Sequence, residues 1–343
     1  MNTAITPLFA RITQFMRLVR WSEWFDSKLP FVLGACWLAA LTGSSVSTFL
    51  AIRLLLFAGF YLAFGYAVND WADRASDARA GKTNRLAALS PWVALCLLVG
   101  LFLASLIPIA PEMENVAVLM GVLAAYCLAV AYSARPLRLK ERGQWGLLGA
   151  AIAQRSLPCW IVLAIDGVPL AGWLYVVAVT QLGLRWMLSH QLDDLNADRR
   201  SGTGTYTVQR GPGTAERQMG RLFTVECVVL CALIALMAWE QPLFLLIPAL
   251  YLPVTTFMSR RTGQGLRQML AWPDTAYFVL SDFYFVYWLV GGCLIASGLH
   301  AVPITWAAVT AIWLRRHLRE HAAGLRWAWG QRPDPAGHNG RSI

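Results

Sequence analysis

Charged residues are scarce in this chain of 343 residues: Asp, Glu, Lys and Arg make up 14% of it, against about 25% in soluble domains. Apolar residues make up 57%, and the mean hydropathy is +0.50. This composition excludes a disordered chain and argues against a soluble enzyme. It predicts an all-α, multi-pass transmembrane helix bundle around a central cavity, with about nine crossings of about 20 residues each.

The sequence also lacks any C-x-x-C pair. Its seven cysteines all fall within apolar runs, which indicates small apolar fillers rather than disulfides or metal ligands. The N-terminus has no short apolar core ahead of a small-residue cleavage site, so we expect no cleavable signal peptide.

The apolar runs alternate with basic loops. The runs fall at 29–50, 51–69, 89–110, 116–132, 146–165, 168–190, 220–239, 242–258 and 277–298, and a shorter run at 301–314 is a candidate tenth segment. All but three of the 29 Lys and Arg residues lie in the N-terminal segment, the loops after the second, fourth, sixth and eighth runs, or the tail. This asymmetry explains the net charge of +10 without a nucleic-acid partner. The positive-inside rule places these loops in the cytoplasm, which predicts an integral protein of the bacterial inner membrane.

Three regions follow from this pattern. Residues 1–28 hold apolar side chains at helical spacing with Arg around them, which predicts an amphipathic interfacial helix. Residues 29–314 form the predicted transmembrane domain. Residues 315–343 are basic and rich in Gly and Pro toward their end, which predicts a partly disordered tail.

Two acidic segments each close a long apolar run. Asp70, Asp73 and Asp77 share a helical face by their spacing. Asp194 and Asp198 are four residues apart and share another. Crowded carboxylates stay ionised together most readily around a divalent cation, and oxygen ligands favour Mg²⁺. Two such clusters suggest metal ions clamped around a diphosphate, whereas a solvated acidic helix end is the plainer alternative.

A basic segment lies between the two acidic ones. Arg138, Lys140 and Arg142 alternate, so an extended loop would project all three side chains together. Such a loop suits phosphate oxygens. A positive-inside loop without a ligand explains the same charges equally well.

The three segments together resemble the UbiA superfamily of intramembrane prenyltransferases. That family carries N-D-x-x-D-x-x-x-D after its second helix, Y-S-x-x-P-x-R-x-K-x-R-G after its fourth and D-x-x-x-D after its sixth. All three stand here in that order, from Asn69, Tyr132 and Asp194. Two positions depart from the pattern: Lys82 opens a stretch without the usual proline, and Gln191 replaces an Asp that many members carry.

The resemblance implies a fold of nine helices and specific residue roles. The implied catalytic and metal-binding residues are Asp70, Asp73, Asp77, Asp194 and Asp198. The implied diphosphate-binding residues are Asn69, Lys82, Arg85, Tyr132, Arg138, Lys140 and Arg142. It also implies a prenyl diphosphate donor and an apolar tunnel open to lipid.

Polar residues inside apolar runs are costly and usually face the interior of the bundle. We expect Arg155, Arg185, His190 and Gln191 to line the substrate pocket, with Tyr66 as an aromatic wall. Buried ion pairs are an equal alternative, including a pair between Arg155 and Asp282.

These observations predict Mg²⁺-dependent transfer of a prenyl group from a prenyl diphosphate to a lipophilic, aromatic or quinone-like acceptor. A terpene cyclase on the same scaffold is the alternative, because the tail could attack its own cation. A non-enzymatic transporter or lipid-binding protein is a third possibility, which the crowding of Asp at two helix ends argues against.

Overall fold

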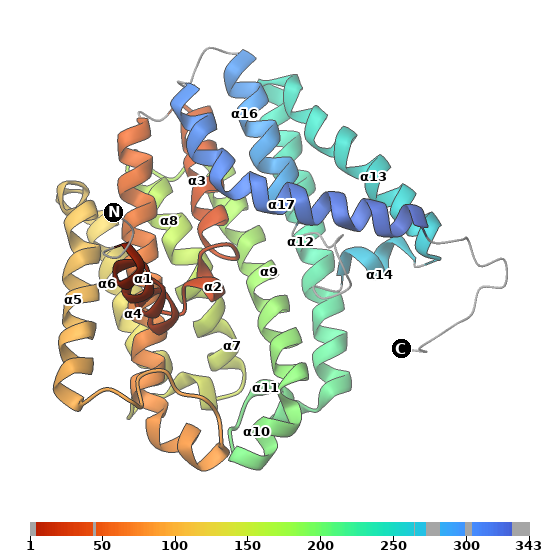
Figure 1. Cartoon of the computed structure of the whole chain (residues 1–343). Helices are drawn as coiled ribbons and strands as arrows, with labels where there is room; N and C mark the ends of the chain where they lie inside the picture. The colour runs from red at the N-terminus through yellow and green to blue at the C-terminus, as the bar shows by residue number, and fades with distance from the viewer. Residues whose placement is uncertain (1–4, 44–45, 264, 272–281, 299–303, 331–343) are drawn as a thin grey trace.

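The chain is a bundle of helices (Figure 1). The computed structural model describes residues 5–43, 46–263, 265–271, 282–298 and 304–330, and it has no strand among them. This confirms the predicted all-α class. Part of the run at 277–298, the start of the run at 301–314 and the tail from 331 lie outside the described residues.

The first half of the chain begins with the short helices α1 and α2, and longer helices follow. In order these are α1 (Ile5–Leu18), α2 (Trp21–Trp24), α3 (Leu29–Leu41), α4 (Thr48–Ala80), α5 (Pro91–Ile109), η1 (Ala110–Glu114), α6 (Val116–Ser133), η2 (Leu139–Glu141), α7 (Gln144–Ala151), the π turn η3 (Ile152–Ser156) and α8 (Leu157–Ala164).

The second half of the chain runs from α9 to α17. Its elements are α9 (Leu170–Asp193), α10 (Leu195–Ser201), α11 (Tyr206–Arg210), α12 (Pro212–Glu240), η4 (Pro242–Leu245), α13 (Leu246–Thr262), α14 (Leu266–Ala271), the π turn η5 (Phe283–Trp288), α16 (Leu289–Gly298) and α17 (Ile304–Gly330).

Six of these helical segments are long and apolar enough to cross a membrane. They are Thr48–Arg79, Pro91–Glu114, Val116–Ser133, Gln144–Ala164, Pro212–Glu240 and Pro242–Thr262. Leu29–Leu41 and Phe283–Ile295 are shorter apolar helices, and α9 lies between α7 and α12, with contacts to both.

Local sequence fixes where the second long helix begins and ends. The predicted boundary at residue 50 is displaced, because α3 ends at Leu41 and α4 begins at Thr48. Ser47 caps α4 by accepting a hydrogen bond from the Leu50 amide at 3.1 Å. At the other end Gly81 adopts a left-handed conformation (φ 64°), which glycine tolerates without strain. The turn at Gly81 directs the following segment back toward the bundle.

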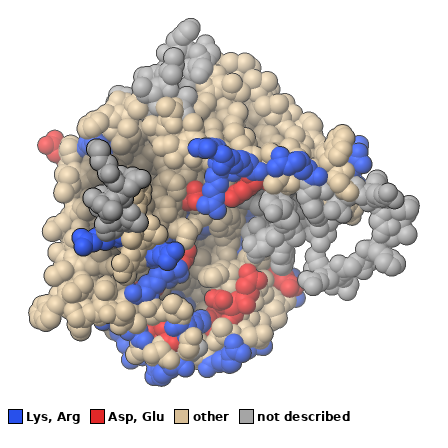
Figure 2. All heavy atoms as spheres, viewed as in Figure 1, with Lys and Arg blue, Asp and Glu red and all other residues tan. Residues whose placement is uncertain are grey.

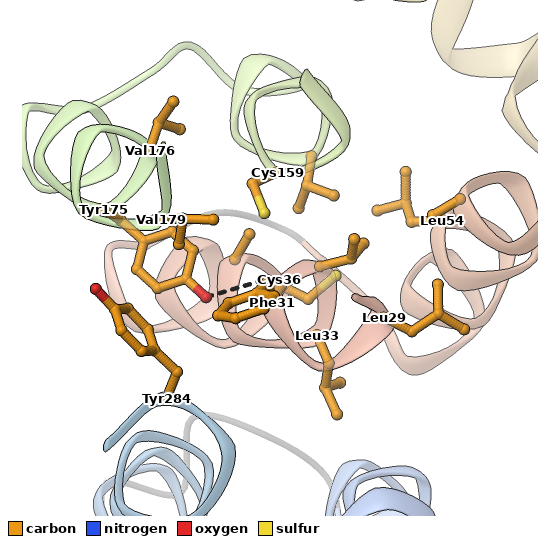
Figure 3. Packing of buried hydrophobic residues seen from close by; sticks show 14 of the residues in the cluster. Leu29, Phe31, Leu33, Cys36, Leu54, Cys159, Tyr175, Val176, Val179 and Tyr284 are labelled. Carbon is orange, nitrogen blue, oxygen red and sulfur yellow. Dashed lines mark hydrogen bonds between the residues drawn. The ribbon is translucent and has the colours of Figure 1, made fainter. Parts of the chain in front are cut away.

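The short helix α3 lies at the centre of the core (Figure 3). The Tyr175 hydroxyl of α9 donates to the Phe31 carbonyl at 2.9 Å, and the Trp288 indole donates to the Gly34 carbonyl at 3.2 Å. A Cβ at Gly34 would collide with the Tyr175 hydroxyl. Glycine at this position therefore lets three helices meet closely.

The C-terminal helix α17 lies across the bundle at a steep angle (Figure 1) and contacts α13 and α16. It runs unbroken across residue 314, after which the sequence predicts a tail. His317 on this helix is buried, stacks on Phe285 and bonds the Asp26 carbonyl at 3.0 Å. The part of the predicted tail up to Gly330 is thus helical and packed.

The N-terminal helix α1 exposes apolar side chains. Phe9, Ile12 and Phe15 are 63%, 47% and 42% exposed. This is the surface that an interfacial helix would bury in lipid headgroups, and the interfacial position itself stays a prediction.

Candidate active site

Both acidic segments line one cavity. Its volume is about 170 Å³, and it lies at the end of the bundle where α4 and α9 end beside α10 (Figure 1). Figure 2 shows acidic and basic side chains gathered around a hollow in one face of the molecule. We call the cavity of about 170 Å³ the acidic cavity. The candidate site residues from the sequence that line it are Asn69, Asp73, Asp77, Lys82, Tyr132, Arg138, Lys140, His190, Gln191, Asp194 and Asp198.

Asp73 is the most heavily paired carboxylate of the first segment. Arg138 donates to its Oδ1 at 3.0 Å, and Lys140 forms an ion pair with its Oδ2. Lys140 also donates to Asn69 Oδ1 at 3.1 Å, and Ser133 donates to the same oxygen. Burial lowers the pKa of Lys140 although Asp73 opposes this. The basic loop therefore reaches the first acidic segment directly.

Asp77 and Asp70 are joined through an asparagine that the sequence did not single out. Asn84 Nδ2 donates to Asp77 Oδ2 at 2.8 Å and to the Asp70 backbone carbonyl at 2.6 Å. The side chain of Asp70 turns instead to Arg20, which donates to its Oδ1 at 2.9 Å. Asp70 is 4% exposed, and it lines neither the acidic cavity nor the larger cavity that adjoins it.

The second segment meets the first through a lysine. Lys82 Nζ lies 3.6 Å from Asp198 Oδ1. Burial, and then the charge of Asp194, raises the pKa of Asp198. Gln191 stands where the motif pattern often has an Asp. It accepts hydrogen bonds from the Thr207 amide (3.2 Å) and hydroxyl (3.3 Å). Its amide thus holds α11 against α9.

A larger cavity of about 460 Å³ adjoins the acidic one. Four residues line both: Asn69, Tyr132, Met187 and His190. Its other walls combine the aromatic side chains of Tyr61, Tyr66 and Trp186 and several small apolar residues with polar and charged side chains, which include Lys28 and Arg155. We call this space the aromatic cavity.

Two of the predicted diphosphate-binding residues lie outside the two cavities. Arg85 forms an ion pair with Glu23 at 2.9 Å. Arg142 donates to the Pro136 carbonyl at 3.0 Å. Both are absent from the residues that line the two cavities, since their side chains find partners outside.

Arg185 differs most from its expected place in the substrate pocket. It is 0% exposed and forms an ion pair with Glu226 of α12 at 2.8 Å, and Tyr284 donates to the other oxygen of that carboxylate at 3.1 Å. The buried-pair alternative holds for this residue. Asp282, by contrast, bonds His321 at 3.4 Å rather than Arg155.

Arg20 and Lys28 are site residues that the sequence reading assigned only to the N-terminal segment. Arg20 adopts a left-handed conformation (φ 57°) between α1 and α2. That turn places both residues on the wall of the aromatic cavity. No motif marks them, because the contact joins segments 50 residues apart.

The carboxylates of the site are held by cations and amides. Among the described residues, no three His, Cys, Asp or Glu side chains come together as a ready-made metal site. The acidic cavity nevertheless offers carboxylate and amide oxygens on one wall and Lys and Arg on another, which is a donor set suited to a hard cation beside an anion.

The model of the UbiA prenyltransferase family matches residues 28–272. The chain belongs to the UbiA prenyltransferase family. Its acidic cavity is thus the meeting place of the family's motifs, and the chain is a prenyltransferase by that membership. No curated protein matches its sequence.

Solved structures of a UbiA homologue from Archaeoglobus fulgidus share this fold. The form bound to GPP and Mg²⁺ aligns with a TM-score of 0.59 at 21% identity, covering 83% of this chain and 99% of that one. The form bound to DMAPP and Mg²⁺ aligns with a TM-score of 0.58 at 20% identity over the same shares. A third structure aligns with a TM-score of 0.55 at 19% identity, covering 91% of this chain and 99% of that one.

Proposed function

We propose that this chain transfers a prenyl group from a prenyl diphosphate to a lipophilic, aromatic or quinone-like acceptor, with Mg²⁺ as cofactor. The observation that carries this proposal is the convergence of Asp73 and Asp198, from distant parts of the chain, on one cavity with Lys and Arg side chains. The homologue bound to GPP and Mg²⁺ supports the same donor class.

The donor's diphosphate would lie in the acidic cavity. Asp73, Asp77, Asp194 and Asp198 would hold the metal, and the oxygen-only donor set fits Mg²⁺. Bound Mg²⁺ supplies neutralisation of the charge that develops on the leaving diphosphate. Arg138, Lys140 and Lys82 add fixed positive charge at the same place.

The prenyl tail and the acceptor would occupy the aromatic cavity. When the allylic C1–O bond breaks, its electron pair leaves with the diphosphate, and C1 becomes electrophilic. A nucleophilic carbon of the acceptor forms the new bond and loses its proton to the released diphosphate or to a nearby carboxylate. The rings of Tyr61, Tyr66 and Trp186 stabilise a cation and keep water away from it.

The orientation in the membrane follows from the charges. The loops around the acidic cavity, at 81–90, 134–143 and 194–211, carry many of the chain's Lys and Arg residues. The positive-inside rule supports a cytoplasmic opening for that cavity, in a bacterial inner membrane. Fused to a chain that ends at Gly211, in one of these loops, a reporter that is active only in the periplasm would contradict this orientation if it worked.

Purified full-length protein with GPP or a longer prenyl diphosphate, Mg²⁺ and an aromatic acceptor tests the reaction. Diphosphate release together with a prenylated acceptor is the expected result. A cyclic hydrocarbon or terpenoid alcohol as the main product, with or without acceptor, would establish the cyclase instead. No diphosphate release under any condition would contradict both.

A further inference from the structure

A third space in the bundle is a groove of about 260 Å³ between α13, α16 and α17. We call it the outer groove. Apolar side chains from these helices line it, among them Leu246, Leu250, Val254, Val290, Leu294 and Leu318. Leu250 and Leu294 are each about half exposed, so the groove opens sideways, toward the lipid around a membrane bundle. Two of its sides, α16 and α17, follow residue 272, where the match to the family model ends.

The polar side chains of the outer groove already have partners inside the protein. Tyr287 and His321 share a hydrogen bond of 3.0 Å, and His321 also pairs with Asp282 at 3.4 Å. The described residues that line the groove include no Lys, Arg, Asp or Glu. The groove therefore suits a hydrocarbon chain rather than a polar solute.

The length of the outer groove matches an acyl chain. It follows α13 from Leu246 to Val254, which is about 12 Å of helix. One leaflet of the hydrocarbon core is about 15 Å thick, so the groove can hold most of one acyl chain. Beyond Val254, α13 ends with Arg260 and Arg261, in a loop that the charge pattern places in the cytoplasm. A lipid in the groove would thus belong to the cytoplasmic leaflet.

A row of arginines lies beside the groove on α17. Arg315, Arg319 and Arg326 share one helical face by their spacing, and all three are exposed. Arg315 is one turn before Leu318, which lines the groove. Figure 2 shows basic side chains in a row where α17 crosses the bundle. The apolar groove is therefore bordered by positive charge.

These arginines have no counter-ion of their own. In the part of the chain that the structure describes, none of the three forms an ion pair, since the nearby Glu320 pairs with Arg316 at 2.8 Å and with His317 at 3.6 Å. Like charges four residues apart on a helix repel each other. An anion between Arg315 and Arg319 would relieve that repulsion.

We infer that the outer groove binds an anionic glycerophospholipid, with one acyl chain along α13 and the phosphate beside Arg315 and Arg319. A guanidinium suits phosphate oxygens, and basic residues next to a membrane helix attract anionic lipids of the cytoplasmic leaflet. A zwitterionic lipid could fill the groove equally well but would not neutralise the arginines. The inference requires that the bundle lie in a bilayer, and it does not depend on prenyl transfer.

The test compares two lipids with the same acyl chains. Full-length protein in detergent is titrated with dioleoyl phosphatidylglycerol and, separately, with dioleoyl phosphatidylcholine. Native mass spectrometry counts the bound lipids, and the thermal midpoint reports their affinity. We expect the anionic lipid to bind about tenfold or more tightly, because each basic residue at the membrane surface contributes about fivefold. Equal affinity for the two lipids would overturn the inference.

Variants locate the lipid on α17. Arg315→Gln combined with Arg319→Gln should remove the preference for phosphatidylglycerol. The matched control is Arg217→Gln combined with Arg221→Gln, which removes two exposed arginines with the same spacing from α12. Neither control residue lines the outer groove, so that variant should keep the preference. A preference that persists without Arg315 and Arg319, or that falls equally in the control, would show general charge attraction instead of this site.

A variant of the groove itself tests the acyl chain. Leu250→Trp should fill the groove and weaken the binding of both lipids, and unchanged binding would overturn the inference. This variant still decides if the double arginine variant does not fold. Two other occupants would also contradict the proposal. One is a second copy of this chain, seen as a lipid-free dimer that Leu250→Trp dissociates. The other is the donor, seen as GPP displacing phosphatidylglycerol.

Discussion

Lys82 Nζ lies 3.6 Å from Asp198 Oδ1. The lysine follows the first acidic segment and the aspartate belongs to the second, so the contact joins the two halves of the site. It shows that both segments face the same cavity rather than opposite sides of the bundle. The cations of the site form ion pairs with carboxylates that we assign to Mg²⁺.

Removing one of these carboxylate charges should therefore remove activity more than stability. We expect Asp198→Asn and Asp73→Asn each to lower kcat/KM for diphosphate release from GPP by about 10²-fold or more, because charge stabilisation of the leaving group is lost. Higher Mg²⁺ should recover part of the loss, and chelation should abolish activity in every variant. Asp166→Asn is the control, since Asp166 is exposed between α8 and α9. Unchanged release in Asp198→Asn would refute the assignment.

Arg20 ties the N-terminal segment to the first motif, and its loss should loosen that segment. Asp70 is buried and Arg20 donates to it at 2.9 Å, so Arg20→Gln should lower the free energy of unfolding by about 1–3 kcal/mol. Arg20→Gly loses the same pair but relieves the left-handed backbone (φ 57°), which recovers about 1 kcal/mol.

Thermal unfolding in detergent measures this difference. We expect the midpoint to fall in the order unaltered protein, Arg20→Gly, Arg20→Gln, with exposed Arg17→Gln close to the unaltered protein. If Arg20→Gly is the less stable of the two, backbone strain at this turn is negligible.

Acid should weaken the packing of α17. Burial lowers the pKa of His317 from 6.5, so the folded protein holds this imidazole neutral where the unfolded chain would protonate it. The unfolded state then binds more protons below about pH 6.5, and stability contributed by the neutral ring is lost as the pH falls through the folded pKa. His317→Gln should flatten the dependence of the thermal midpoint between about pH 6.5 and pH 5. A slope equal to that of the unaltered protein would assign the acid sensitivity to other groups.

The sequence predicts much of the acidic cavity because its residues are set by helical spacing. Asp73 and Asp77 face the cavity as expected. Asp70 shares their helical face yet pairs with Arg20, because helix periodicity says nothing about a partner from another segment. Arg155 and Arg185 show the same limit: both are lone arginines in apolar runs, but only Arg185 has Glu226 opposite it. Long-range pairing distinguishes them, and no local pattern encodes it.

The buried pair of Arg185 and Glu226 provides a test of that distinction. Both side chains are 0% exposed, so replacing either one alone leaves an uncompensated charge in the bundle. Arg185→Leu and Glu226→Leu should each destabilise the protein by about 3–5 kcal/mol, whereas the double variant should recover most of that loss. Thermal or denaturant unfolding of the four proteins gives the coupling energy. Additive losses in the double variant would mean that the two residues do not act as a pair.

The unpaired Arg155 should behave in the opposite way, because Arg155→Leu removes a buried charge and leaves no carboxylate of the described chain without its partner. We expect that variant to be as stable as the unaltered protein or more so, and its thermal unfolding in detergent measures this.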